Sequence, residues 1–327
     1  MSCPACGVSI VDGDRFCESC GHRLIPALQW LSSKALPGPC PHCGSSDVGA
    51  QGYCENCGQR RGAGQDHAEL DLGGLGGATD RGHHKARNED AMAIATLGAA
   101  SIAVVCDGVS SSTRPDTAAT AAIDACMPAL LEVLGRGGSP RTATEAGTRA
   151  AAKAVVALGT PADNPPSCTY VSAIVTGTEV TVGWVGDSRA YWLDGAESSC
   201  LTTDDSLAAQ LAARGGEAGQ PTAPAADADP RSLALIRWLG ADAGDTEPTV
   251  VVFAPTGPGT VLVCSDGLHR YLPEPDKLAE ATAAIGEPPT ATAAALTQFA
   301  LDSGGVDNIA IAVLPFPPYE PPEGSAQ

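Results

Sequence analysis

The chain is poor in aromatic residues and has no apolar run of the kind that crosses a membrane. Aromatic residues make up 4% of its 327 residues, so we expect a core built mainly from Ala, Val, Leu and Ile. No apolar stretch approaches the ~20 residues of a membrane-spanning helix, and the N-terminus lacks the charged and apolar regions of a signal peptide. We therefore expect a cytoplasmic protein without a membrane partner.

Basic residues are scarce as well. There are 19 Lys and Arg against 38 Asp and Glu, which gives a net charge of −19. Residues 1–62 carry five basic and five acidic residues, so the whole imbalance lies in the rest of the chain. An acidic body argues against non-specific binding of nucleic acid, and solubility is the simplest role for most of this surface charge.

Cysteine, by contrast, is abundant near the N-terminus. Eight of the 13 cysteines fall in four C-x2-C pairs, each followed by glycine, and ten residues separate the two pairs of each half. Two such pairs close a tetrahedral site with no open position, which predicts structural zinc rather than free or redox-active thiols. The expected ligands are Cys3, Cys6, Cys17 and Cys20 for one Zn²⁺, and Cys40, Cys43, Cys54 and Cys57 for a second Zn²⁺.

These motifs resemble short zinc-ribbon modules, which are too small to fold without metal. The apolar residues between the two ribbons, Leu28, Trp30 and Leu31 among them, are expected to pack between the ribbons or on a larger domain. The predicted divisions are ribbons at 1–24 and 37–62, a Gly-rich linker at 63–74, one large domain at 75–316 and a Pro-rich tail at 317–327.

Short apolar strands and longer helical stretches share the large domain. Three strands, 170–176, 180–185 and 190–193, follow one another with short turns, which favours antiparallel sheets with helices packed outside. Further strands are predicted at 92–96, 101–106, 250–253, 260–264 and 309–313. Helices are predicted at 115–134, 142–158, 206–214, 232–239, 275–284 and 290–302.

Acidic segments lie beside the ends of these strands. They are 87–90, 106–108, 186–189 and 264–267, with 307–308 as a fifth. A rigid scaffold can direct several such carboxylates into one cleft, and hard cations such as Mg²⁺ and Mn²⁺ need oxygen ligands of this kind. Two such ions about 3.5–4 Å apart lower the pKa of a shared water and yield a hydroxide nucleophile. The sequence therefore predicts a two-metal site for phosphoryl chemistry.

The five segments, in this order, resemble the bacterial form of the metal-dependent type 2C serine/threonine protein phosphatases, and the resemblance covers residues 75–314. It implies an α+β fold, a four-layer α-β-β-α sandwich of two antiparallel sheets flanked by helices. It also implies hydrolysis of phosphoserine and phosphothreonine by a metal-bridging hydroxide, with two or three Mn²⁺ or Mg²⁺ ions. Phosphorylated proteins are the implied substrates, and a serine/threonine kinase of opposing action is the implied partner.

The resemblance assigns the first metal ligands by position. Asp107 matches the aspartate that bridges the two catalytic metals, and Gly108 matches the glycine that offers its carbonyl to one of them. Asp266 and Asp307 match the carboxylates on the first metal. Substitution of Asp107 or Asp266 is therefore expected to abolish catalysis.

The remaining acidic residues have supporting roles in the family. Glu89 and Asp90 match an acidic pair that holds metal-bound water. Asp187 matches the residue that, together with Asp266, binds a third metal in bacterial members. Asn308 matches a polar residue beside the last aspartate. All of these residues are thus candidates for one metal centre.

The phosphate-binding position departs from the family pattern. The arginine expected there is Lys85, which keeps the charge but lacks the bidentate fork, and Arg87 is the alternative. The loop after the bridging aspartate has Val109 and Ser110 where the family has glycines or a histidine that protonates the leaving group.

Three other groups of residues were considered for roles at the site. His83, His84 and His269 are candidates for a proton donor, although a surface or supporting role is the simpler expectation. Cys106 and Cys264 end apolar strands and are expected in the core. The stretch 203–230 resembles the family's substrate flap, with Ser206 as a helix N-cap.

Two other functions compete with the phosphatase reading. A catalytically weak phosphatase-like scaffold would bind metal or phosphoprotein without useful turnover. Binding of nucleic acid through the ribbons is disfavoured, because residues 1–62 are formally neutral and each Zn(Cys)₄ centre adds two negative charges. We expect the ribbons to serve in recruitment or regulation, and their sequence does not identify a partner.

Overall fold

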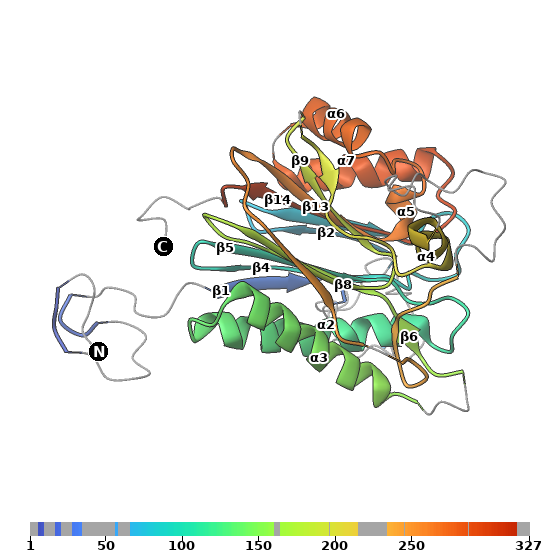
Figure 1. Ribbon diagram of the computed structural model, residues 1–327, viewed down its shortest axis with the longest axis horizontal. Helices are drawn as coiled ribbons and strands as arrows, with labels where there is room; N and C mark the ends of the chain where they lie inside the picture. Colours follow the sequence, from blue (N-terminus) through green and yellow to red (C-terminus); the bar gives the residue numbers. More distant parts are fainter. Residues whose placement is uncertain are drawn as a thin grey trace.

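Two six-stranded antiparallel sheets lie face to face, and helices cover the outer face of each (Figure 1). This computed structural model describes residues 6–9, 17–20, 28–34, 56–57, 66–159, 164–195, 197–214, 234–244, 246–286 and 288–318. The arrangement has four layers in the order helices, sheet, sheet, helices. It confirms the predicted α-β-β-α sandwich.

The first sheet has the strand order β1-β4-β5-β7-β8-β12. Helices α2 and α3 pack against each other and cover its outer face (Figure 1). Ser139 caps the second helix, accepting a hydrogen bond from the Thr142 amide, and proline occupies its first turn. The elements are β1 (Leu28–Ser32), β4 (Ala91–Leu97), β5 (Ala100–Cys106), β7 (Tyr170–Val175), β8 (Val180–Val185), β12 (Thr249–Phe253), α2 (Pro115–Gly135) and α3 (Pro140–Val156).

The second sheet has the order β10-β9-β13-β14-β3-β2 and is covered by α5, α6 and α7 (Figure 1). Its elements are β2 (His67–Asp71), β3 (Gly76–Asp80), β9 (Arg189–Leu193), β10 (Ser199–Cys200), β13 (Gly259–Cys264), β14 (Ile309–Phe316), α5 (Asp266–His269), α6 (Pro275–Ile285) and α7 (Pro289–Asp302). A small ladder of β6 (Ser167–Cys168) and β11 (Leu239–Gly240), together with α4 (Leu207–Arg214), lies near one end of the sandwich.

The core forms three apolar layers, one between the sheets and one under each helical layer. Residues such as Met92, Val105 and Val263 fill the layer between the sheets. The central strands are buried on both faces, so they read as continuous apolar runs rather than alternating ones. The buried face of α2 combines alanines with Ile123, Leu130 and Leu131 and has no aromatic residue, as the low aromatic content predicted.

Three segments differ from the sequence predictions. The expected linker 63–74 contains β2, which pairs along its whole length with β3 because Leu70 turns into the core and the backbone completes the sheet edge. The helix predicted at 232–239 is wrong for its described residues, since 234–238 are not helical and β11 pairs with β6. The stretch between the ribbons supplies β1, a strand that the pattern of side chains did not predict.

Helix α2 has almost the predicted limits, 115–134, but it is more apolar than the sequence analysis allowed. Among the described residues it is the one helix of 18 residues or more that is apolar enough to span a membrane by length and composition, with 21 residues and a mean hydropathy of 1.4 over an 18-residue window. The expectation that no apolar stretch reaches this length is therefore wrong by that measure. Its buried residues contact α3, β4 and β5, and the core helix of a globular protein passes the same test.

Close approach of α7 to the second sheet depends on a glycine. A Cβ on Gly76 would collide with the backbone of Thr290 in the first turn of α7. We expect Gly76→Ala to lower the free energy of unfolding by about 1–3 kcal/mol, because backbone must shift to make room. Gly177→Ala is the matched control, since a Cβ there meets nothing within 4 Å. Urea denaturation compares the two, and equal losses in both variants would contradict this account.

Candidate functional site

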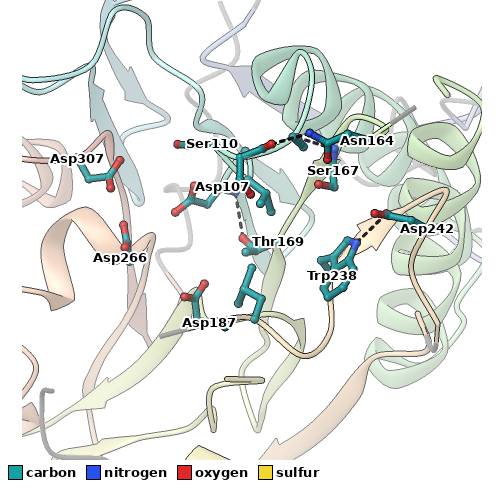
Figure 2. Close-up of a pocket in the computed structure, with 16 residues that line it drawn as sticks. Asp107, Ser110, Asn164, Ser167, Thr169, Asp187, Trp238, Asp242, Asp266 and Asp307 are labelled. Atoms are coloured by element: carbon teal, nitrogen blue, oxygen red, sulfur yellow. Dashed lines mark hydrogen bonds between the residues drawn. The ribbon is translucent and has the colours of Figure 1, made fainter. Parts of the chain in front are cut away.

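Carboxylates from strand ends far apart in the sequence surround one cavity. Asp107 follows β5, Asp187 lies between β8 and β9, Asp266 follows β13, and Asp307 precedes β14. These four side chains line a cavity of about 480 Å³ together with the loop of Ser110. Figure 2 shows how they lie around it. The structure therefore brings together residues that the sequence placed in four separate segments.

Burial makes these charges costly. It raises the pKa of Asp187 to about 8, with repulsion from Asp266 as the next cause, and it raises the pKa of Asp90 to about 7. Burial and neighbouring carboxylates also hold the pKa of Asp107 well above its usual value and raise the pKa of Asp266. Carboxylates in this state bind either protons or cations.

The site has the donor set that divalent cations need. The Oδ1 atoms of Asp90 and Asp266 are buried and lack a hydrogen-bond partner within the described part of the protein. Unpaired buried carboxylate oxygens are rare unless a ligand satisfies them. Hard oxygen ligands in a concave, acidic site fit Mg²⁺ or Mn²⁺.

Lys85 points into the cluster. Its Nζ lies 2.6 Å from Asp307 Oδ1, 2.7 Å from Ser110 Oγ and 4.0 Å from Glu89 Oε2. Burial lowers the pKa of Lys85, but the hydrogen bond to Asp307 and the other carboxylates outweigh it, so the pKa is raised. Arg87, the alternative phosphate ligand, is 59% exposed and pairs instead with Asp116 at 3.3 Å.

A second cation at the site was missed from the sequence. Arg270 Nη2 lies 2.6 Å from Asp266 Oδ2 and 3.6 Å from Asp307 Oδ2. Asp266 and Arg270 are four residues apart, and residues at this spacing lie side by side on a helix. The sequence could therefore have indicated this ion pair if α5 had been recognised as a helix. Lys85 and Arg270 thus approach Asp307 through its two different oxygens.

The turn that carries Glu89 and Asp90 is held by side chains from other elements. Asn308 accepts a hydrogen bond from the Glu89 amide at 2.8 Å and donates to the Arg87 carbonyl at 3.0 Å. Asp90 is fully buried and accepts a hydrogen bond from Ser265 Oγ at 2.7 Å. The acidic pair is therefore fixed from β14 and from the end of β13.

Gly108 lies where no other residue fits. A Cβ at this position would stand 2.7 Å from the Pro115 carbonyl and 2.8 Å from the Glu89 carbonyl. Contacts this short do not occur for real Cβ atoms, so the helix and the acidic turn can approach only a glycine. This packing leaves the Gly108 backbone at the cavity wall, beside Asp107.

The histidine candidates separate clearly. His269 is buried, and burial holds its pKa well below the usual value, so the neutral ring donates from Nε2 to the Asp187 carbonyl at 3.0 Å. This contact holds the backbone of Asp187 in place. His83 and His84 are exposed.

A buried ion pair next to this contact also escaped the sequence analysis. Arg189 forms a bidentate pair with Asp204, with both N–O distances at 2.8 Å, and the arginine is 3% exposed. The pair ties β9 to the start of the predicted flap. Ser206 accepts from the Ala209 amide at 3.3 Å, as expected for an N-cap, whereas 215–233 lie outside the described residues.

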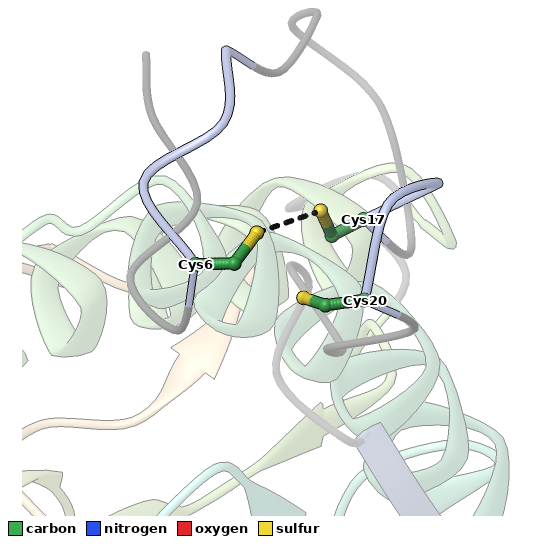
Figure 3. A group of neighbouring side chains, drawn as sticks. All are labelled: Cys6, Cys17 and Cys20. Atoms are coloured by element: carbon green, nitrogen blue, oxygen red, sulfur yellow. Dashed lines mark hydrogen bonds between the residues drawn. The ribbon is translucent and has the colours of Figure 1, made fainter.

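The cysteines fall into two groups. Cys106 and Cys264 are fully buried in the core as predicted, and burial raises the pKa of both thiols. Near the N-terminus, Figure 3 shows Cys6, Cys17 and Cys20 turned toward one another, with their sulfur atoms all within 4.8 Å. Three thiols at this spacing fit three corners of a Zn(Cys)₄ site. The other predicted zinc ligands, Cys3, Cys40, Cys43 and Cys54, lie outside the described residues, and Cys57 is described without them.

The family model of protein phosphatase 2C matches residues 79–299, the stretch that carries Asp107, Asp187 and Asp266 of the cavity, while Asp307 lies just beyond it. This chain belongs to the protein phosphatase 2C family. The double zinc ribbon model matches residues 3–58, so the phosphatase domain is preceded by a double zinc ribbon.

Relatives in the family are serine/threonine phosphatases. The phosphatase stp of Listeria welshimeri is 38% identical over 112 residues, which are 34% of this chain and 42% of that protein. PstP of Mycobacterium tuberculosis is 28% identical over 245 residues, 74% of this chain and 45% of that protein. The chain thus spans less than half the length of these curated relatives.

The fold is also that of a solved family member. The catalytic domain of PstP, solved in complex with two manganese ions, superposes with a TM-score of 0.56 at 23% sequence identity. The match covers 73% of this chain and 96% of that one. At this level of identity, the superposition shows that the two chains share the fold.

The raised carboxylate pKa values predict how stability depends on pH before metal is added. At Asp90 and Asp187 the folded protein keeps protons that the unfolded chain loses between about pH 4 and pH 8, so the contribution of these two groups to stability falls as pH rises through that window. Mn²⁺ replaces the protons and flattens the slope. Urea midpoints measured from pH 5 to pH 8, with and without Mn²⁺, test this. A metal-free midpoint that rises over the window would overturn the assignment, and Asp187→Asn is expected to reduce the slope.

Proposed function

We propose that this protein is a metal-dependent phosphatase that removes phosphate from phosphoserine and phosphothreonine in proteins. The observation that carries the proposal is the ring of carboxylates around one cavity at the end of a phosphatase 2C fold, where Asp266 has a buried oxygen without a hydrogen-bond partner among the described residues. Asp107, Asp266 and Asp307 are the proposed metal ligands, with Asp187 as a ligand of a third ion. The metals are two or three Mn²⁺ or Mg²⁺ ions, in line with the two manganese ions of the PstP catalytic domain.

The chain's own residues bind and orient the phosphate. Mn²⁺ or Mg²⁺ bound here would supply the Lewis acidity that generates a nucleophile from water near neutral pH. Lys85 and Arg270 place positive charge on the same side of the cluster as Asp307. Lys85 Nζ also meets Ser110 Oγ at the cavity wall, so it is the side chain best placed to hold a phosphate oxygen.

The cavity extends away from the carboxylates toward Trp238 and Asp242, whose side chains are joined by a hydrogen bond of 3.0 Å (Figure 2). This opening is the proposed site for the substrate protein. A serine/threonine kinase of opposing action is the expected partner. The protein is proposed to work in the cytoplasm, where reducing conditions keep thiols available for two structural Zn²⁺ ions, and the ribbons are proposed to recruit or regulate.

The decisive experiment is hydrolysis of para-nitrophenyl phosphate by the purified full chain with and without Mn²⁺. We expect Mn²⁺-dependent turnover that falls by about 100-fold or more in Asp107→Asn, because the substitution removes a central metal ligand. Asp276→Asn, on the exposed first turn of α6, is the matched control and should leave turnover unchanged. A folded protein without turnover would instead favour the phosphatase-like scaffold.

Lys85 and Arg87 are distinguished by a second comparison. Lys85→Met should raise KM for the phosphate ester about 10-fold, since it removes a charge-assisted hydrogen bond to phosphate. Lys85→Arg should retain most of the affinity. Arg87→Met, which alters an exposed arginine paired with Asp116, should leave KM unchanged. Steady-state kinetics decide the assignment, and the reverse pattern would transfer the phosphate-binding role to Arg87.

A further inference from the structure

The segment between the two groups of zinc-binding cysteines is part of the catalytic sheet. Strand β1 lies between Cys20 and Cys40 in the sequence, and it pairs residue by residue with β4, from Leu28 opposite Leu97 to Ser32 opposite Ala93. It forms the edge of the first sheet, beyond β4 (Figure 1). Its neighbour in the sheet, β4, begins directly after Asp90.

Side chains contribute little to the docking of β1. Leu28 is 48% exposed, Trp30 40% and Leu31 38%, so the strand is held mainly by its backbone ladder. Its end is different, because Ser33 is buried and forms two hydrogen bonds with Met92. The Ser33 amide donates to the Met92 carbonyl at 2.9 Å, and the Met92 amide donates to Ser33 Oγ at 3.0 Å.

Lys34 follows this anchor and reaches the acidic turn of the metal site. Its Nζ donates a hydrogen bond to the Asn88 carbonyl at 2.9 Å, across 54 positions of sequence. Burial lowers the pKa of Lys34, while the carboxylates around it, with Asp90 the strongest, act in the opposite direction. The Lys34 ammonium group is therefore mostly buried among carboxylates, and it donates its hydrogen bond to a backbone carbonyl oxygen.

Asn88 organises the turn that Lys34 contacts. Its Oδ1 accepts from the Asp90 amide at 3.1 Å, and its Nδ2 donates to Thr79 Oγ1 at 2.9 Å. Asn308 holds the Glu89 amide, as described above. The acidic turn is thus held by hydrogen bonds with two residues from elsewhere in the chain. Asn308 precedes β14, and Lys34 comes from the inter-ribbon segment.

We propose that Lys34 is a positioning residue of the metal site, supplied by the segment between the zinc-binding cysteines, and that its bond to the Asn88 carbonyl orients Glu89 and Asp90 for divalent-cation binding. The inference rests on the proposed function for the identity of the cation. It gives the inter-ribbon segment a specific role in the catalytic domain, because this segment places the Lys34 ammonium group at the turn of Glu89 and Asp90.

A positioning role and a purely electrostatic role predict opposite results. A positive charge near the cluster repels Mn²⁺, so its removal alone would strengthen Mn²⁺ binding. Loss of a group that orients the surroundings of a metal weakens binding instead, by about 10-fold or more. The sign of the change in Mn²⁺ affinity therefore separates the two roles.

The test is calorimetric titration of Mn²⁺ into the zinc-loaded full chain. We expect Lys34→Met to weaken Mn²⁺ binding about 10-fold and Lys34→Arg to restore most of it. Lys277→Met is the control, because Lys277 is exposed on α6 and pairs with Glu274. Unchanged or tighter binding in Lys34→Met would overturn the proposal.

Two further measurements keep the outcome clear. Circular dichroism and urea denaturation establish that each variant is folded, and Lys34→Gln replaces Lys34→Met if the latter does not fold. The Mn²⁺ titration does not depend on turnover. A wild-type protein that binds Mn²⁺ without hydrolysing phosphate esters would therefore defeat the proposed function, while the comparison of Lys34 variants would still decide the positioning role.

Discussion

The cost of ionising several carboxylates in one site, first through loss of solvation and then through their mutual repulsion, is the constraint on which the rest of this structure depends. Asp107, Asp187 and Asp266 come from different strand ends. Asp187 and Asp266 add to the energetic cost of ionising Asp107, and Asp266 adds to the cost of ionising Asp187. A flexible backbone would relieve that repulsion by moving the side chains apart. The two stacked sheets prevent such movement, and glycines at Gly108 and Gly267 let the surrounding backbone approach too closely for the loops to rearrange.

The supporting contacts around the site have one feature in common. Each loop that carries a carboxylate is held by a hydrogen bond from a residue of another element. Asn308 fastens the turn of Glu89, Ser265 fastens Asp90, and His269 fastens the backbone of Asp187. None of these contacts crosses the cavity. The carboxylates are therefore held from the side away from the cavity, while the cavity itself stays open. This arrangement lets cations enter an acidic site without changing its shape.

The sequence was most informative where side chains carry the signal. Strand β8 has the predicted limits, because its apolar run is buried on both faces and ends at turns. The acidic segments were found for a similar reason, since carboxylates beside apolar strands are conspicuous. Arg270 and the pair of Arg189 with Asp204 were missed because their roles arise from spatial neighbours. Strand β1 was missed because its exposed side chains leave no periodic pattern, and its stability comes from backbone pairing.

The position of β1 has a consequence for how the protein can be divided. A fragment that begins after the second ribbon would lack the outermost strand of the first sheet, so the backbone N–H and C=O groups of β4 would face solvent along a free edge. Such an edge pairs readily with other chains, and the fragment would tend to aggregate for reasons unrelated to its active site. A phosphatase unit without this free edge therefore has to retain chain from both sides of the second ribbon, which makes the second ribbon, but not the first, an insertion within the catalytic fold.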